Sequence, residues 1–459
     1  MFLGKTQRIH FIGIGGSGMS GIAEVLINQD YDVSGSDQSK SSVTDHLESL
    51  GAEINFNHNA ENVYGKHVVV VSSAICSNNP EVKAAREEMI PVIPRAEMLA
   101  ELMRMKHGIA IAGTHGKTTT TSLVATVLAG GHLDPTIIVG GKLKNMGGHA
   151  KLGQSKFLVA EADESDGSFL KLSPTLAVVT TLDEEHMDYY NNMQNMKSAF
   201  LEFLNSVPFY GTAILCVDDP NLQSLLPKIE KRTLTYGLKT QADYTAREIS
   251  VNELKTNFTV FYQGKNLGKI SSCSLGNHNI CNTLAAIAVG MELNIDFPTI
   301  ADALKVFSGV QRRFEILHRS DSLIIIDDYG HHPAEIQATL STAKEVWPNR
   351  RLVVVFQPHR FSRTQHLMES FYSSFNDADQ LFLLDIYGAG EKPIEGIHSR
   401  AMAQGIREFG HKNVDYIEKV EILVPHLQNS LQSGDVILTL GAGNIGELAH
   451  KLVAQFHDW

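Results

Sequence analysis

Short apolar runs alternate with segments of helical periodicity along almost the whole chain, and this alternation constrains the fold more than any other feature. The runs are rich in valine, isoleucine and leucine and end at glycine or polar turn residues, as parallel strands covered on both faces do. Strands that alternate with helices predict βαβ units and doubly wound sheets. The expected strands are Ile9–Ile12, Val68–Val71, Ile109–Ala112, Phe157–Ala160, Ala177–Thr180, Leu323–Ile326, Leu352–Phe356, Leu381–Leu384 and Val436–Leu440.

The chain of 459 residues is long enough for several domains, because a domain usually holds roughly 100–200 residues. We predict an α/β protein of three domains. A Rossmann-like domain spans residues 1–106, a P-loop ATPase-like α/β domain spans 107–314, and a second Rossmann-like domain spans 315–459. The central domain carries a β-rich insert, Asp243–Ile270, in which apolar and polar residues alternate.

The formal net charge of −12 argues against nucleic acid or an anionic membrane as a dedicated partner. No apolar stretch approaches the length that spans a bilayer, so we expect no membrane insertion. Gly13, Gly15 and Gly16 interrupt the N-terminal apolar run, which favours a first β-strand over a signal peptide. The four cysteines are scattered, which suits the reducing cytoplasm and predicts neither a zinc site nor a disulfide framework.

A first glycine loop, Gly13–Gly21, follows a predicted strand and opens a predicted helix. Gly13, Gly15 and Gly18 fit the pattern G-x-G-x-x-G, whose glycines let the backbone approach a diphosphate at a helix N-terminus. Asp37 follows roughly 20 residues later, where an acid can reach a ribose hydroxyl. NAD, the diphosphate of a UDP-sugar and a turn without any ligand all remain open at this point.

A second glycine loop, Gly113–Thr119, also lies between a predicted strand and a predicted helix. Its G-K-T sequence predicts a phosphate-binding loop in which backbone N–H groups surround the phosphates. Lys117 then places a cation on the outer phosphates, and Thr118 offers an oxygen to Mg²⁺. The leading glycine of the usual pattern falls at Ile111, so this loop is shorter than in typical P-loop proteins.

Acidic residues follow the next predicted strand, and a carboxylate at the end of a strand beside a P-loop is the usual second anchor for Mg²⁺. Five residues in this neighbourhood can fill the role, and Glu161 is our choice because it lies nearest the strand. His186 follows a further strand. Imidazole is not a preferred ligand of hard Mg²⁺, so metal ligation and a core or capping role remain equally open for it.

The C-terminal third places basic residues in a pattern that suits anionic substrates. Arg360 and Arg363 lie one turn apart if Arg360 opens a helix, so that both can face one carboxylate or phosphate. His331 can accept or orient a proton near neutral pH. A third glycine run, Gly441–Gly446, is similar to a dinucleotide-binding fingerprint but is interpreted as a helix-opening turn.

The ordered motifs resemble the Mur ligases, the ATP-dependent amide synthetases of bacterial cell-wall precursor assembly, over essentially the whole chain. The two glycine loops, the acidic segment at Glu161 and the His-Met-Asp motif at His186 carry the first part of the resemblance. The remaining motifs are Gly276–Asn279 with Asn282, Arg312–Phe314, Asp327–Pro333, and Gln357–Arg360 with Arg363.

The resemblance implies a role for each motif. UDP-N-acetylmuramate would be bound by Gly15, Gly16, Ser17, Gly18, Met19, Asp37, Ser72 and His115. ATP would be bound by Gly113, Thr114, His115, Gly116, Lys117, Thr118, Thr119, His278, Asn279, Asn282, Arg313 and Asp328. Mg²⁺, with Mn²⁺ as a tolerated substitute, would lie on Thr118, Glu161 and His186. The amino acid would be bound by Tyr329, His331, His359, Arg360 and Arg363, and catalysis would involve Lys117, His186, His331, Arg360 and Arg363.

The implied reaction joins L-alanine to the carboxylate of UDP-N-acetylmuramate through an acyl phosphate and a tetrahedral intermediate. Several relatives carry a carbamylated lysine a few turns after the His-Met-Asp motif. Here Leu201 lies near that point and Lys197 is out of register, which favours the alanine-adding branch. We expect a cytoplasmic monomer or weak homodimer.

Three alternatives are weighed against this expectation. A murein-tripeptide recycling ligase would use the same nucleotide sugar but join it to a peptide. An NAD-dependent oxidoreductase would explain the first glycine loop but not the second. A P-loop regulatory switch would leave the third domain without a role.

Overall fold

The computed structural model describes residues 4–72, 74–139 and 150–456. Contacts divide the chain into two compact units. The N-terminal unit consists of Met1–Ser250, Thr256–Cys273 and Asn279–Ser308, and the C-terminal unit consists of Val251–Lys255, Ser274–His278 and Gly309–Trp459. Among the described residues, no helix combines the length and the apolar character needed to cross a bilayer.

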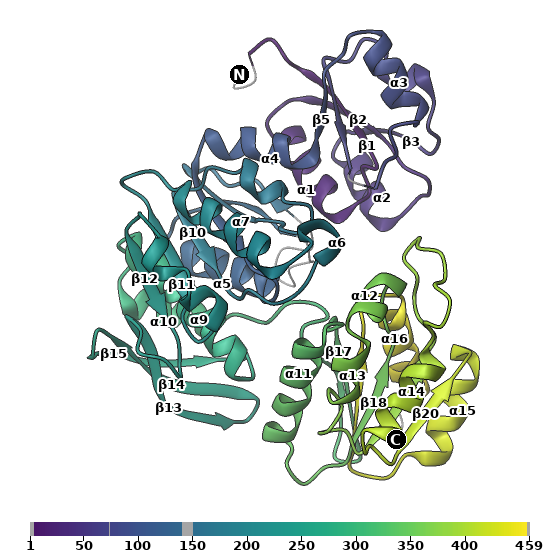
Figure 1. Ribbon diagram of the computed structural model, residues 1–459. Helices are drawn as coiled ribbons and strands as arrows, with labels where there is room; N and C mark the ends of the chain where they lie inside the picture. The colour runs from purple at the N-terminus through teal and green to yellow at the C-terminus, as the bar shows by residue number, and fades with distance from the viewer. Residues whose placement is uncertain (1–3, 73, 140–149, 457–459) are drawn as a thin grey trace. The chain divides into compact units, whose positions relative to one another are not determined.

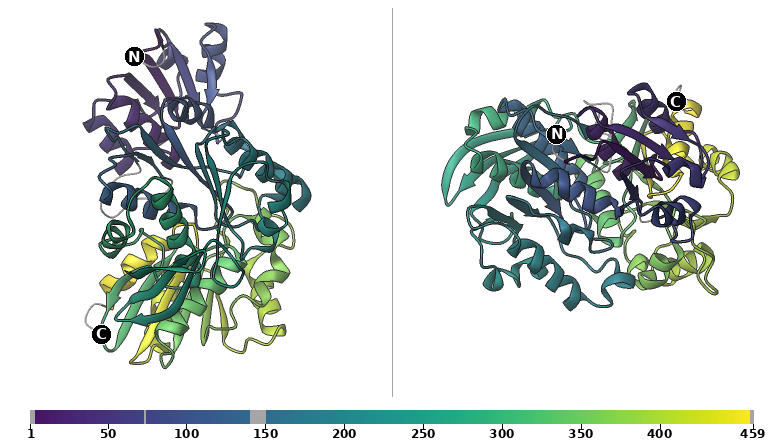
Figure 2. Two further views of the ribbon diagram at one scale, coloured as in Figure 1. Left: turned by 90° about the vertical axis from the view of Figure 1, so that its left-hand side faces the viewer. Right: turned by 90° about the horizontal axis from the view of Figure 1, so that it is seen from above.

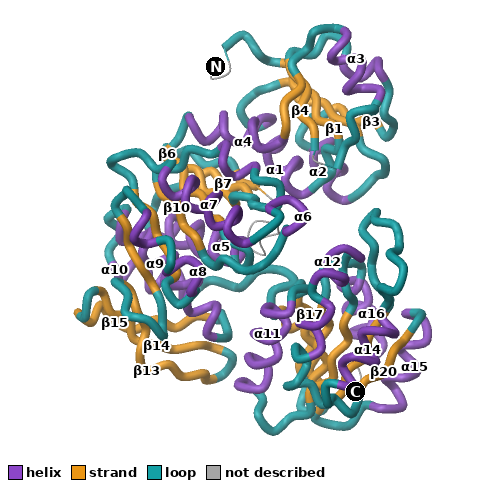
Figure 3. The backbone as a smooth tube through the Cα atoms, viewed as in Figure 1, coloured by secondary structure: helices purple, strands orange, loops and turns teal. Residues whose placement is uncertain are grey.

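The first sheet has five parallel strands in the order β3-β2-β1-β4-β5. Its strands are β1 (Arg8–Ile12), β2 (Asp32–Ser36), β3 (Glu53–Asn55), β4 (Val68–Val71) and β5 (Val92–Pro94). The accompanying helices are α1 (Ser17–Ile27), α2 (Ser42–Ser49), the 3-10 helix η1 (Ala60–Val63), α3 (Pro80–Glu87) and α4 (Arg95–Arg104). Figure 3 shows the strands enclosed between these helices. The loops after β1, β2 and β4 therefore meet at one edge of the sheet, where ligands of doubly wound folds bind.

The second sheet has ten strands in the order β15-β14-β13-β12-β11-β10-β6-β9-β7-β8. The strands are β6 (His107–Ala112), β7 (Thr136–Ile138), β8 (Ala150–Lys151), β9 (Phe157–Glu161), β10 (Leu176–Val179), β11 (Thr212–Cys216), β12 (Thr233–Tyr236), β13 (Tyr244–Asn252), β14 (Lys255–Tyr262) and β15 (Lys265–Ser272). The helices are α5 (Lys117–Gly130), η2 (Ser168–Lys171), α6 (Met187–Tyr190), α7 (Met193–Asn205), α8 (Pro220–Gln223), η3 (Leu226–Lys228), α9 (Asn277–Glu292) and α10 (Phe297–Lys305). Strands β6, β9 and β10 are parallel neighbours, so the loops that follow them lie at one edge.

The third sheet has six strands in the order β16-β17-β21-β18-β19-β20, of which only the edge strand β16 is antiparallel to its neighbour. The strands are β16 (Glu315–Arg319), β17 (Leu323–Asp328), β18 (Leu352–Phe356), β19 (Gln380–Leu384), β20 (Val414–Ile417) and β21 (Asp435–Leu440). The helices are α11 (Pro333–Val346), α12 (Phe361–His366), α13 (Met368–Tyr372), α14 (Ser399–Glu408), α15 (Val420–Ser430) and α16 (Ile445–Gln455).

Alternate residues of β17 enter two separate cores of the C-terminal unit. Ile324 and Ile326 pack with side chains of α11, α13 and α14, whereas Leu323 and Ile325 pack with side chains of α15 and α16. The strand is covered on both faces, as its uninterrupted apolar sequence predicts. Figures 1 and 2 show helices on both sides of this sheet.

The expected fold class is confirmed: each of the nine apolar runs overlaps a strand of a mixed α/β structure with parallel sheets. The insert forms β13, β14 and β15, of which β14 and β15 pair antiparallel. Strand β2 was not expected because its sequence contains two serines and a glycine. Gly35 is needed there, since a Cβ would lie 2.5 Å from Ile14 Cδ1. The boundaries of the three domains stay predictions.

Candidate functional site

The second glycine loop joins β6 to α5 in a conformation that requires glycine at two positions. Gly113 has φ 130° and a Cβ there would collide with the Thr180 hydroxyl; Gly116 has φ 80° and directly precedes α5. Such positive φ angles disfavour residues with a Cβ. The loop thus places the N-terminus of α5 at the carboxyl edge of the second sheet, as predicted for a phosphate-binding loop.

The ammonium group of Lys117 folds back over its own loop. Its Nζ donates to the carbonyl oxygen of Gly113 at 2.6 Å and lies 2.9 Å from the carboxylate of Glu164, which is 1% exposed. Burial opposes the charge on Lys117, but the Coulombic attraction and hydrogen bond of Glu164 outweigh it and raise the pKa of Lys117. The lysine is therefore held as a cation at the mouth of the loop.

Two buried carboxylates and one imidazole gather beside this cation. Ligand atoms of Glu164, Glu185 and His186 all lie within 4.8 Å of one another, and His186 Nε2 is 3.6 Å from Glu164 Oε1. His186 is the N-cap residue of α6, and its backbone has φ 57°, a left-handed conformation that is uncommon for residues other than glycine. Carboxylate oxygens suit Mg²⁺, so the group fits a hard divalent cation.

This group differs from the predicted set of Thr118, Glu161 and His186. Only His186 belongs to both, while Thr118 lies in the first turn of α5 and Glu161 ends β9. The sequence left five residues after the predicted strand open, and the structure brings Glu164 of that segment, together with Glu185, to the histidine. Both metal sets stay predictions.

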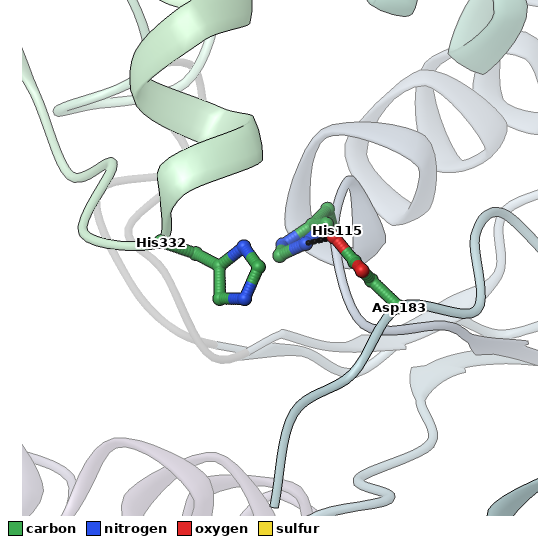
Figure 4. A group of neighbouring side chains, drawn as sticks. All are labelled: His115, Asp183 and His332. Carbon is green, nitrogen blue, oxygen red and sulfur yellow. Dashed lines mark hydrogen bonds and ion pairs between the residues drawn. The ribbon is translucent and has the colours of Figure 1, made fainter. Parts of the chain in front are cut away.

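The remaining loop residues are fixed by hydrogen bonds to the segment after β10. Thr114 Oγ1 lies 3.0 Å from Thr181 Oγ1 and accepts from the backbone N–H of Asp183 at 3.1 Å. The backbone N–H of His115 donates to Thr181 Oγ1. The His115 Nε2 lies 3.3 Å from Asp183 Oδ2, and Figure 4 shows these two side chains next to each other. Sequence patterns did not indicate Thr181 or Asp183, because they lie more than 60 positions from the loop.

Helix α9 contributes an asparagine to the same loop. Asn282 Oδ1 accepts from Thr120 Oγ1 at 3.1 Å, and a Cβ on Gly116 would lie 2.8 Å from that oxygen. Asn282 Nδ2 donates to Asn279 Oδ1 at 3.0 Å, so the two predicted asparagines act as a pair. Desolvation lowers the pKa of His278 to about 4, which keeps the imidazole neutral at pH 7.

The first glycine loop is anchored to the end of β2. The backbone N–H groups of Gly13 and Ile14 donate to the carbonyl oxygen of Ser36 at 2.8 and 3.1 Å. Gly16 precedes α1, and Ser72 follows β4 next to Gly13, where a Cβ would lie 3.3 Å from Ser72 Cβ. The predicted loop residues and Ser72 are therefore brought together; Met19 is buried beneath them, and the side chain of Ser17 lies outside what the structure describes.

Asp37 is hydrogen-bonded to the first glycine loop. Its Oδ2 accepts from the backbone N–H of Gly15 at 2.8 Å, and its Oδ1 accepts from the N–H of Gln38 at 2.8 Å. The carboxylate thus occupies a donor of the very loop that was predicted to hold a diphosphate. Its contact with a ribose stays a prediction.

In the C-terminal unit, the Arg312-Arg313 motif anchors the strand ends. Arg312 Nε donates to Asp327 Oδ2 at 2.8 Å and its Nη2 donates to the carbonyl oxygen of Gly441 at 2.6 Å. The third glycine run therefore opens α16 and is held by Arg312. Asp328 accepts from the N–H groups of Phe314 and Gly330, yet burial dominates and raises its pKa to about 6.

The predicted amino-acid site forms a cluster of rings and guanidinium groups at the ends of β17 and β18. His359 stacks on Tyr387 at 5.7 Å, lies 5.8 Å from the His331 ring, and its Nδ1 is 3.2 Å from Arg363 Nη1. Burial, the His331 ring and the two neighbouring arginines lower the pKa of His359 to about 3. Arg360 is the N-cap of α12, so Arg360 and Arg363 lie one turn apart as predicted.

Two other features were not indicated by sequence. Tyr387 was not predicted, although its ring completes the cluster. Ligand atoms of Cys216, Asp218 and Cys281 also lie within 4.8 Å of one another, but Asp218 already accepts from the N–H groups of residues 238–240.

His332, whose ring is drawn in Figure 4, caps α11 through its Nδ1.

The three sheets and the lysine-bearing glycine loop define an α/β nucleotide-binding enzyme. Family models match the chain along its length: the Mur ligase family, catalytic domain, over residues 8–107, the Mur ligase middle domain over 111–290, and the Mur ligase, glutamate ligase domain, over 312–443. The chain belongs to the Mur ligase family.

Individual relatives agree with this membership. UDP-N-acetylmuramate–L-alanine ligases of Syntrophotalea carbinolica and Geobacter sulfurreducens are 56% and 55% identical over 98% and 99% of both chains. The solved UDP-N-acetylmuramate-alanine ligase of Thermotoga maritima is 30% identical, with a TM-score of 0.83 over 98% of this chain and 99% of its own. A murein peptide ligase from Psychrobacter arcticus shares the fold at 22% identity and a TM-score of 0.71, covering 98% of each chain.

Proposed function

We propose that this enzyme joins L-alanine to the carboxylate of UDP-N-acetylmuramate and converts ATP to ADP and phosphate. The observation that carries the proposal is the cationic Lys117 at the glycine loop, beside the Glu164–Glu185–His186 group, in a chain that is 52–56% identical to enzymes named for this reaction. Amide formation from a carboxylate in water is uphill, so coupling to ATP is chemically necessary.

In the proposed first step, a carboxylate oxygen of the sugar attacks the γ-phosphorus of ATP, and the bond to the β-phosphate oxygen breaks. Phosphoryl transfer depends mainly on positioning and charge neutralisation. Lys117 exchanges Glu164 for the outer phosphates, and the N–H groups at the start of α5 bind the remaining oxygens. We assign Asn279 and Asn282, with His278, to the adenine side of this loop.

In the proposed second step, the alanine nitrogen attacks the acyl carbon, and phosphate leaves from the tetrahedral intermediate. Cations stabilise the oxyanion that forms. We assign this role to Arg360 and Arg363, and we assign the orientation of the amine to His331. His359 is neutral at pH 7 and can accept a hydrogen bond there.

The divalent cation is assigned to the N-terminal unit. Glu164, Glu185 and His186 fit Mg²⁺ by their two buried carboxylates, and Thr118 and Glu161 remain the alternative ligands. Mg²⁺ bound with ATP would neutralise charge on the transferring phosphoryl group. The four free cysteines suit a cytoplasmic location, which we propose together with a monomer or weak homodimer.

The proposal is tested by phosphate release from ATP and UDP-N-acetylmuramate, screened across amino acids and a murein tripeptide. We expect release with L-alanine and its loss in Lys117→Met, while circular dichroism shows an unchanged fold. Lys151→Met serves as the control because Lys151 forms an ion pair with Asp134 in which both side chains are about half exposed. Release only with the tripeptide would favour the recycling reaction, and full activity of Lys117→Met would refute the loop assignment.

A further inference from the structure

Arg95, the first residue of α4, lies against the first glycine loop. A Cβ on Gly18 would come within 2.7 Å of Arg95 Nη1 and 3.1 Å of Arg95 Cδ, so the guanidinium group covers the first turn of α1. An anion bound at this helix N-terminus would therefore meet a fixed cation in addition to the backbone N–H groups.

The same guanidinium group also reaches the acidic segment beside the second glycine loop. Arg95 Nη2 donates to Asp163 Oδ2 at 2.8 Å, and Asp163 Oδ1 accepts from the N–H of Ser165. The carbonyl oxygen of Asp163 accepts from Phe169 N–H and Ser168 Oγ. The next residue along the chain, Glu164, holds Lys117. One arginine thus touches the loop after β1 and orders the segment that positions Lys117.

Stability alone does not require this contact. The Arg95 and Asp163 side chains are 21% and 40% exposed, and ion pairs of this exposure contribute only about 0–1 kcal/mol. A second ion pair joins the same two elements, because Lys171 of η2 lies 3.3 Å from Glu97 of α4. Lys171 and Glu97 touch neither glycine loop in the described contacts. Breaking this second ion pair therefore tests whether a loose attachment of α4 is enough to change nucleotide binding, without removing a contact to either loop.

We propose that Arg95 is a positioning residue that couples the two glycine loops, so that a diphosphate-containing substrate at the first loop strengthens binding of the Mg²⁺–nucleotide at the second. The proposal rests on the proposed function. The guanidinium group of Arg95 would then bind the diphosphate on one side and Asp163 on the other, so that its position is fixed from both sides. The acidic segment is then ordered before the nucleotide arrives, and less ordering free energy is lost on nucleotide binding.

The test is calorimetric titration of the full chain with a non-hydrolysable ATP analogue and Mg²⁺, with and without saturating UDP-N-acetylmuramate. We expect wild type to bind the analogue at least about fivefold more tightly with the sugar nucleotide, the lower end of typical coupling. Titration in the reverse order must give the same factor. Arg95→Met should reduce the factor towards one, Arg95→Lys should restore part of it, and Lys171→Met should retain it.

Asp163→Asn breaks the same pair from the other side and should also reduce the factor, which keeps the proposal testable if Arg95→Met does not fold. A wild-type factor of one, or an unchanged factor in both Arg95→Met and Asp163→Asn, overturns the proposal. Failure of the sugar nucleotide to bind wild type at all would instead overturn the proposed function. The two failures are distinguishable because the first requires that both ligands bind.

Discussion

Glu81 is a fully buried carboxylate in the first turn of α3, and its neutralisation should destabilise the first sheet. Its Oε2 accepts from Ser36 Oγ at 2.7 Å and lies 2.8 Å from His58 Nδ1. Its Oε1 accepts from Asn62 Nδ2 at 2.6 Å and lies 3.4 Å from His10 Nε2. Burial opposes the charge, but these four hydrogen bonds outweigh it and lower the pKa of Glu81 from 4.5 to about 2.

The lowered pKa gives the size of the stabilisation. The difference of about 2.5 pKa units between the unfolded and the folded chain corresponds to about 3 kcal/mol in the free energy of unfolding. Because the folded-state pKa is depressed, the contribution is fully present above pH 4.5 and is lost as the pH falls towards 2. Glu81→Gln should therefore lower the free energy of unfolding by about 3 kcal/mol at pH 7, and the deficit should shrink by about 2 kcal/mol by pH 3.

The assay is urea unfolding of wild type and variant across pH, because the difference between them removes the contributions of other titrating groups. Hydrogen exchange of β1 and β2 amides at pH 7 locates the loss, which matters in a chain with several cooperative units. Glu61→Gln is the matched control, since Glu61 lies exposed in the neighbouring η1. Equal unfolding of the two variants at pH 7, or a deficit independent of pH, would refute the reasoning.

Two further predictions concern the nucleotide loop and the C-terminal unit. Asn282→Leu removes the acceptor of Thr120 and the partner of Asn279, so KM for ATP should rise about tenfold while KM for the sugar nucleotide changes little, as initial-rate kinetics would show. The folded-state pKa of His359 is lowered to about 3, so the unfolded chain binds the extra proton below pH 6.5 and stability is lost as the pH falls towards 3. His359→Gln should reduce this loss of stability at acid pH, which thermal melts at a series of pH values would measure. An unchanged loss would contradict the burial of His359 beside His331 and the two arginines.

The elements that carry the candidate site were predictable because their signals are local. The loop from Gly113 to Lys117 is contiguous, and its glycines are required by φ angles that few other residues adopt. Strands β6, β9 and β10 contain the apolar runs Ile109–Ala112, Phe157–Ala160 and Leu176–Val179, as strands covered on both faces do. Arg360 and Arg363 could be placed one turn apart because both belong to one short helix and the residue before it.

The partners of these elements were not predictable because their contacts join distant segments. Glu161 ends β9 and Glu164 lies three residues further on, and no periodicity decides which of the two carboxylates turns towards Lys117. The structure selects Glu164, 47 positions from Lys117, as the partner of the ammonium group. Arg95 and Asp163 are 68 positions apart, and Arg95 belongs to none of the sequence motifs, although Asp163 lies in the acidic segment after β9.

The two glycine loops share one feature that involves such contacts between distant segments. At each loop a carboxylate of the chain occupies a donor suited to phosphate: Asp37 accepts from Gly15 N–H, and Glu164 accepts from Lys117 Nζ. Phosphate binding at either loop must therefore replace an existing charge-assisted hydrogen bond. The net binding free energy is then smaller than the new phosphate contacts alone suggest. A displaced carboxylate beside bound phosphates is repelled unless a cation accompanies it. At the first loop, Arg95 is the cation beside the displaced carboxylate. At the second loop, a divalent cation on Glu164 would have this role. The repulsion that opposes binding of a bare nucleotide would therefore favour binding of its Mg²⁺ complex.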